Sequence, residues 1–191
     1  MSQPRRLLRA PALLLLALAV AGGLAPSPAQ AQAIFSGALD GASVNPPTAS
    51  PGSGTAAVTA DEDQLVVDLS FSGLIGASTG SHLHCCGTPP ANVGVAILFP
   101  GFPTGVTSGV YANTFDLANA ATYVTAFLTA NGGTAGGARA ALLTGMDQGR
   151  AYTCVHTIAF AGGEIRSFLA FDSFADGFES MDTLDWSATQ P

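Results

Sequence analysis

Lysine is absent from this chain of 191 residues, and charge of either sign is scarce. Six arginines stand against thirteen acidic residues, so the formal net charge is −7. Proteins that bind nucleic acids or anionic membrane surfaces use many lysines and arginines to neutralise phosphate. The composition therefore argues strongly against both classes of partner.

Cysteine, histidine and tryptophan are also rare, with three, three and one copies. Glycine and proline are plentiful, at 23 and 12, and 48% of the residues are hydrophobic. This hydrophobic content is too high for a disordered chain, and so many turn-forming residues suit short strands better than a helical bundle. The length fits one ordinary domain.

The first 33 residues have the layout of an export signal. Three arginines precede an apolar core from Leu13 to Val20, and small residues follow it. Cleavage after Ala31 or Ala33 fits the small-x-small rule. The apolar stretch is short for a membrane span of about 20 residues. We predict that residues 1–33 are a signal peptide, and that its removal leaves no membrane span and a net charge of −10.

Short apolar runs separated by turn residues predict an all-β domain. Strands are expected over residues 33–39, 54–60, 64–71, 81–85, 93–99, 150–158 and 164–171. The segment 116–149 is expected to hold short helices, chiefly over 135–146. The predicted fold is an immunoglobulin-like or Greek-key β-sandwich, or a small barrel, with a short helical insertion.

Residues 172–191 form an acidic tail that holds the only tryptophan. One interpretation is a frayed end. The pattern from Asp176 to Ser180, followed by Trp186, is similar to short tails of unrelated exported proteins of Gram-negative bacteria. We therefore predict a periplasmic or secreted protein from such an organism.

All three histidines fall in two short segments. His82 and His84 lie two residues apart on one predicted strand, and His156 lies on another. Because residues two apart on a strand point to the same side, His82 and His84 share a face. If the two strands are neighbours, three imidazoles converge, and zinc or copper accepts such a set with one coordination position open. The alternative is a set of histidines that hydrogen-bond within a polar patch.

The three cysteines occupy the same two segments, and thiols of exported proteins are usually oxidised. An odd number leaves one unpaired. We predict a bridge from Cys85 or Cys86 to Cys154, with Cys86 favoured if the strand continues, because it then shares the face of His82 and His84. A vicinal Cys85–Cys86 bridge and metal ligation by a thiolate are the alternatives.

Glu164 and Arg166 lie two apart just after a glycine pair, so they are expected to share a strand face. One hypothesis is that Glu164 hydrogen-bonds to a metal-bound imidazole and orients it. We favour an ordinary ion pair with Arg166 that closes the end of a hairpin.

Several segments resemble, in order, the motifs of the CHRD domain, which is named after chordin. They are residues 35–39, 45–47, 52–56, 82–84, 152–157 and 162–166, so the resemblance covers roughly 34–171. It implies an all-β, immunoglobulin-like domain that acts outside the cytoplasm, and in animal proteins it accompanies growth-factor antagonism. The family usually has Asn where this chain has Cys154, which strengthens the case for a bridge to that residue.

The leading hypothesis is an exported CHRD-domain protein that is not a conventional enzyme and binds zinc or copper through its three histidines. A metal-free extracellular module that binds a protein or glycan is the second hypothesis. Thiol redox chemistry at Cys85 and Cys86 is the third.

Overall fold

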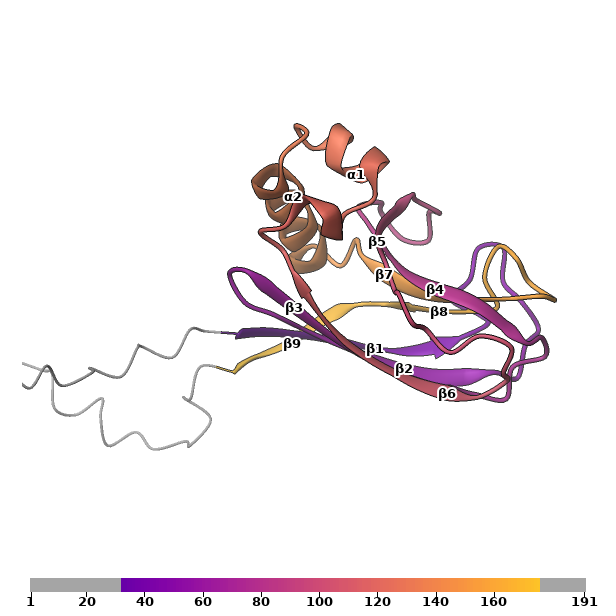
Figure 1. The fold of residues 1–191 in the computed structure, drawn as a ribbon. Coiled ribbons are helices and arrows are strands. Elements are labelled where there is room, and N and C mark those ends of the chain that lie inside the picture. The colour runs from indigo at the N-terminus through magenta and orange to yellow at the C-terminus, as the bar shows by residue number, and fades with distance from the viewer. Residues whose placement is uncertain (1–31, 176–191) are drawn as a thin grey trace, which may run out of the picture.

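A computed structural model describes residues 32–175 (Figure 1). Nearly all of the predicted signal peptide and residues 176–191 of the predicted tail lie outside the described residues. The described part holds nine strands, two α-helices and one 3-10 turn. The strands are β1 Gln32–Asp40, β2 Ser53–Ala60, β3 Gln64–Ser72, β4 Ser78–His84, β5 Val95–Leu98, β6 Gly109–Asp116, β7 Tyr152–Thr157, β8 Ile165–Phe168 and β9 Ala170–Ala175.

The strands form one antiparallel sheet in the order β5-β4-β7-β8-β1-β2-β3-β6, with β9 paired to β1. The sheet curls, and the helices α1 Thr125–Ala130 and α2 Ala135–Asp147 lie over its inner side (Figure 1). The 3-10 turn, Ala120–Thr122, precedes α1. The prediction of an all-β domain with a short helical insertion is confirmed.

Strict alternation along the strands produces the core. In β3 the burial alternates residue by residue, and Leu65, Val67 and Leu69 point inward. Helix α2 contributes Leu142 and Met146, which are both fully buried against the sheet. Burying such side chains supplies most of the stabilisation of a domain of this size.

The strands β4 and β7 place alternate residues in this core as well. Leu83 on β4 and Val155 on β7 are fully buried there. Their sequence neighbours therefore point to the other, outer side of the sheet. All three histidines belong to that outer set, so the fold sets them apart from the hydrophobic core.

Two parts of the strand prediction are corrected. The sequence reading missed β6, in which the two large buried side chains are Tyr111 and Phe115 and the apolar Val110 is 77% exposed. In addition, strand β9 continues to Ala175, and residues 173–175 pair with β1, so the first four residues of the predicted tail belong to the sheet.

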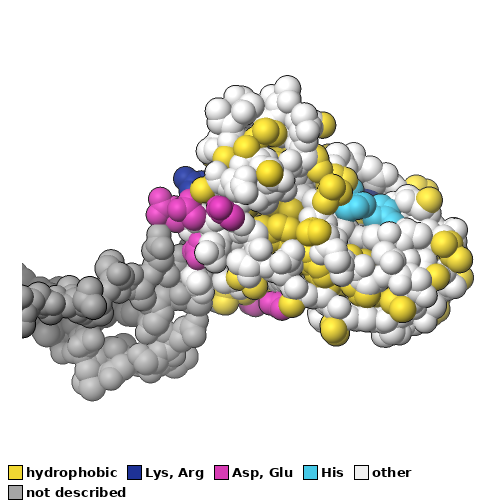
Figure 2. Space-filling model, in the orientation of Figure 1, with side chains coloured by type: hydrophobic (Ala, Val, Ile, Leu, Met, Phe, Trp, Pro, Cys, Tyr) yellow, Lys and Arg dark blue, Asp and Glu magenta, His cyan; other side chains and the backbone are white. Residues whose placement is uncertain are grey.

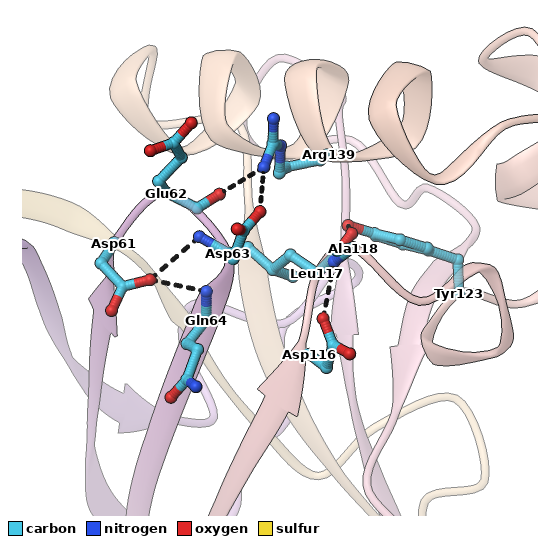
Figure 3. A network of polar contacts seen from close by, with 9 residues as sticks. All are labelled: Asp61, Glu62, Asp63, Gln64, Asp116, Leu117, Ala118, Tyr123 and Arg139. Atoms are coloured by element: carbon cyan, nitrogen blue, oxygen red, sulfur yellow. Dashed lines mark hydrogen bonds and ion pairs between the residues drawn. The ribbon is translucent and has the colours of Figure 1, made fainter. Parts of the chain in front are cut away.

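One polar network ties the turn between β2 and β3 to helix α2 (Figure 3). The Asp61 carboxylate accepts hydrogen bonds from the backbone N–H groups of Asp63 and Gln64, at 3.0 and 2.6 Å. Arg139 on α2 pairs with Asp63 and donates to the Glu62 carbonyl. Such exposed pairs contribute little stability. Within residues 32–175 no helix combines the length and the apolar character that crossing a bilayer requires.

Candidate metal centre

The pairing of β4 with β7 brings the two histidine segments together. The strands are antiparallel neighbours, with His82 opposite Cys154 and His84 opposite Tyr152. Residues directly opposite each other in such a pair point to the same side. His156, two residues from Cys154, shares that side. The sequence predicts that the three imidazoles converge if their two strands are neighbours, and the structure shows that these strands are neighbours.

The three imidazoles are close enough to share one ion. One ring nitrogen from each of His82, His84 and His156 lies within 4.8 Å of the other two. A tetrahedral zinc ion with bonds of about 2.0 Å holds its nitrogens roughly 3.3 Å apart, so rotations that move each ring by about 1 Å suffice. The histidines reach the surface as one compact group, away from the acidic side chains visible on the same face (Figure 2).

Two backbone carbonyls fix which nitrogens are free. Nδ1 of His84 lies 2.9 Å from the Val93 carbonyl, and Nδ1 of His156 lies 2.9 Å from the Ala161 carbonyl. Because a carbonyl only accepts hydrogen bonds, Nδ1 of each ring carries a proton, and in the neutral tautomer Nε2 keeps its lone pair. Both Nε2 atoms, and Nδ1 of His82, are buried with no hydrogen-bond partner. A metal ion satisfies such nitrogens, and metal-binding histidines generally donate their other N–H in this way.

Burial keeps these rings in the form that binds metals. The pKa of His84 is lowered to about 4, and desolvation is the largest cause. The hydrogen bond to the Val93 carbonyl raises this pKa, whereas the charges on His156, His82 and Arg166 lower it. Desolvation, followed by the charge on His156, also lowers the pKa of His82. Both imidazoles are therefore neutral at pH 7, as a ligand must be.

Tyr152 and the loop before β5 hold the His84 ring in place. The rings of His84 and Tyr152 stack with centroids 4.6 Å apart and planes 9° from parallel. The Tyr152 hydroxyl accepts a hydrogen bond from the Val93 N–H at 3.1 Å. The same residue, Val93, thus supports the tyrosine through its N–H and the histidine through its carbonyl.

The predicted long-range disulfide is wrong. Cys85 and Cys86 are bonded to each other, and Cys154 is a buried free thiol. Cys86 was expected to share the face of His82 and His84, but β4 ends at His84 and the alternation of a strand does not extend to Cys86. Beyond that point Cys85 packs into the core, and Cys86 Sγ lies 3.4 Å from the Ala141 carbonyl of α2.

Cys154 points the other way, toward the outer face. A Cβ placed on Gly163, whose φ of +120° already favours glycine, would clash with its sulfur. Burial raises the pKa of the Cys154 thiol to about 11, although Arg166 beside it acts in the opposite direction. The thiol is therefore protonated at neutral pH, and it does not belong to the group of converging nitrogens.

Neither sequence hypothesis for Glu164 matches its contacts. Its carboxylate is fully buried and accepts four hydrogen bonds of 2.5 to 3.1 Å, but none comes from an imidazole or from Arg166. The donors belong to Ser50, Ile75, Gly76 and Thr157. Glu164 is not part of β8, so the expected strand parity with Arg166 does not hold, and its role is to join three chain segments.

Arg166 does lie on the face that carries the histidines. It is paired in register with Cys154, and its guanidinium carbon sits 4.1 Å from the centre of the Tyr152 ring. It donates hydrogen bonds to the Pro90 carbonyl and to the Asn92 side chain. The sequence did not reveal these partners of Arg166. The Pro90, Val93 and Ala161 carbonyls could not be found from it, because a backbone acceptor leaves no signature in the sequence.

Comparison with known proteins gave one match. The family model of the CHRD domain matches residues 35–169. No curated protein and no solved structure matches the chain. The matched range begins in β1 and ends between β8 and β9, so it contains every residue of the candidate metal centre.

Proposed function

The chain belongs to the CHRD domain family, and from that premise we propose that it is an exported binding protein that holds one zinc or copper ion through His82, His84 and His156. One observation carries the proposal. Three ring nitrogens lie within 4.8 Å of one another, and each of the three residues has a buried ring nitrogen without a hydrogen-bond partner.

The donor set indicates the class of ion. Neutral imidazole suits zinc and copper, whereas magnesium and calcium require oxygen ligands. Three protein ligands leave at least one coordination position open. We propose a role in metal storage, metal delivery or stiffening of the sheet, and export through the predicted signal peptide places that role in the periplasm or outside the cell.

A second candidate function rests on the sheet edge. Within residues 32–175, strand β6 has one hydrogen-bonded neighbour strand, β3, and it carries the 77% exposed side chain of Val110. An unpaired edge can accept a strand from another chain. An extracellular protein is the partner that a free strand edge supports.

A thermal melt with and without metal tests the proposed site. We expect zinc, at about a hundred times its dissociation constant, to stabilise the metal-free protein by about 2.7 kcal/mol. For a domain of this size that raises the melting temperature by roughly 5 to 10 °C. The double variant His82→Ala/His84→Ala is expected to show no shift with zinc or with copper.

Cys154→Ala is the matched control, because Cys154 lies opposite His82 on the same face and is not one of the three ligands. It is expected to keep the full shift. If the wild-type protein shows no shift with either metal, the proposed function is wrong. If only Cys154→Ala loses the shift, the thiol rather than the imidazoles binds the ion.

A further inference from the structure

A cavity of about 170 Å³ adjoins the candidate metal centre. Its lining includes His84, His156 and Arg166. Tyr152 and Cys154 are buried in its wall, whereas its rim is exposed at Asn92 and Gly162. The cavity is therefore open to solvent, and one space is shared by two candidate metal ligands and a guanidinium group.

Arg166 is a buried cation without a carboxylate. It is 1% exposed, and among the described residues the one ion pair is that of Arg139 with Asp63. Its contacts are all uncharged: the Pro90 carbonyl at 3.2 Å, the Asn92 side chain, the Cys154 thiol and the rings of Tyr152 and Phe168. Its Nε is buried and has no hydrogen-bond partner. A buried charge that no opposite charge balances is costly, so this arrangement favours an anion nearby.

Metal binding increases this imbalance. Neutral imidazoles do not reduce the charge of a bound ion, so a divalent ion and Arg166 together place three positive charges around one small cavity. The group of converging ligands includes no carboxylate and no thiolate. Arg166 and two of the candidate metal ligands line the same cavity, so a bound ion with an open coordination position and the Nε–H of Arg166 would both favour an acceptor there.

We infer that this cavity binds a small monovalent anion, of the size of azide, formate or bicarbonate, that coordinates the metal ion and accepts a hydrogen bond from Arg166. The inference rests on the proposed function, since it requires the metal. The volume limits the ligand to a few heavy atoms, because sites for larger organic molecules occupy about 300 Å³ or more. Guanidinium groups bind planar or linear anions well because their N–H groups form a rigid fork.

Azide titration of the copper(II)-loaded protein tests the inference, because azide bound to copper(II) gives a charge-transfer absorption band. We expect a saturable band in the wild-type protein. Arg166→Gln is expected to weaken azide binding about thirtyfold, since a buried charge-assisted hydrogen bond is lost. Arg166→Lys keeps the positive charge but lacks the planar fork of N–H groups, and it is expected to weaken azide binding by a smaller factor than Arg166→Gln does.

Arg150→Gln is the matched control, because it removes the same charge from an exposed position; it is expected to bind azide like the wild type. If Arg166→Gln does not fold, Arg166→Lys decides the question. Unchanged azide affinity in a folded, copper-loaded Arg166 variant, or no azide band in the wild type, overturns this inference and leaves the metal site standing. Copper content is measured on the same samples: absence of bound copper overturns this inference, whereas the proposed function is overturned only if zinc also fails to bind.

Discussion

Replacing His84 or His156 by glutamine is expected to lower the affinity for zinc about a thousandfold, and replacing His82 about a hundredfold. A structural zinc site gains on the order of 10 kcal/mol from four ligands, so one ligand is worth roughly 3 kcal/mol. That energy corresponds to about a hundredfold in affinity.

The additional factor of about ten for His84 and His156 comes from their orientation. Both rings donate Nδ1–H to a backbone carbonyl, which holds Nε2 in place before the ion arrives. In the described part of the chain, no carbonyl holds the His82 ring through either of its nitrogens. The His82 ring must therefore lose more freedom on binding, and it contributes less.

Competition with a chromophoric zinc chelator at constant pH measures these affinities. Cys154→Ala again serves as the control and is expected to bind zinc like the wild type. Equal losses for all three glutamine variants contradict the role given to the Val93 and Ala161 carbonyls. No loss for any of the three contradicts the site itself.

The second large effect is on stability. Replacing Glu164 by glutamine is expected to lower the free energy of unfolding by about 3 kcal/mol. One carboxylate oxygen accepts from Ser50 Oγ and the Ile75 N–H, and the other accepts from the Gly76 N–H and Thr157 Oγ1. An amide places an NH₂ group against one of these pairs. Either orientation leaves a buried backbone N–H without an acceptor, because a backbone N–H cannot turn away.

The same carboxylate predicts a dependence on acid. Burial raises the pKa of Glu164, but its four hydrogen bonds outweigh burial, so the pKa lies below its ordinary value. A lowered pKa in the folded state means that the ionised group contributes stability above the ordinary pKa of about 4.3. That contribution is lost as the pH falls through the folded-state pKa. The stability difference between the wild type and Glu164→Gln should therefore shrink in acid.

Chemical denaturation at pH 7 and at pH 3 measures both effects. Asp68→Asn is the matched control, because it also removes one negative charge, from an exposed position on β3. We expect it to change the unfolding free energy by less than about 0.5 kcal/mol. A loss of similar size for both variants, or a difference that grows in acid, contradicts the structural role of Glu164.

Much of the fold could be predicted from the sequence, because apolar and polar residues alternate along a half-buried strand. β3 alternates with large apolar residues at every second position, and its bounds were predicted to within one residue. β6 was missed because its exposed face carries Val110 and Ala112, while its inward face includes the polar Asn113. Apolar and polar residues then no longer distinguish the two faces.

The site could be predicted from the sequence only where strand geometry determines which side chains share a face. His82 and His84 share a face by periodicity alone, and β7 brought His156 beside them once the strands paired. The cysteine prediction failed because it extended that periodicity past the end of β4 to Cys86. Glu164 was misread for a similar reason, since it precedes β8 and three of its four hydrogen-bond donors come from loops distant in sequence.

X-ray absorption at the metal edge of the zinc-loaded protein tests the central claim most directly, because it reports the atoms bound to the ion. We predict three imidazole nitrogens at about 2.0 Å, with at least one further light atom at the open position. A sulfur neighbour at about 2.3 Å, or a first shell without imidazole scattering, would contradict the assignment of His82, His84 and His156 as the ligands.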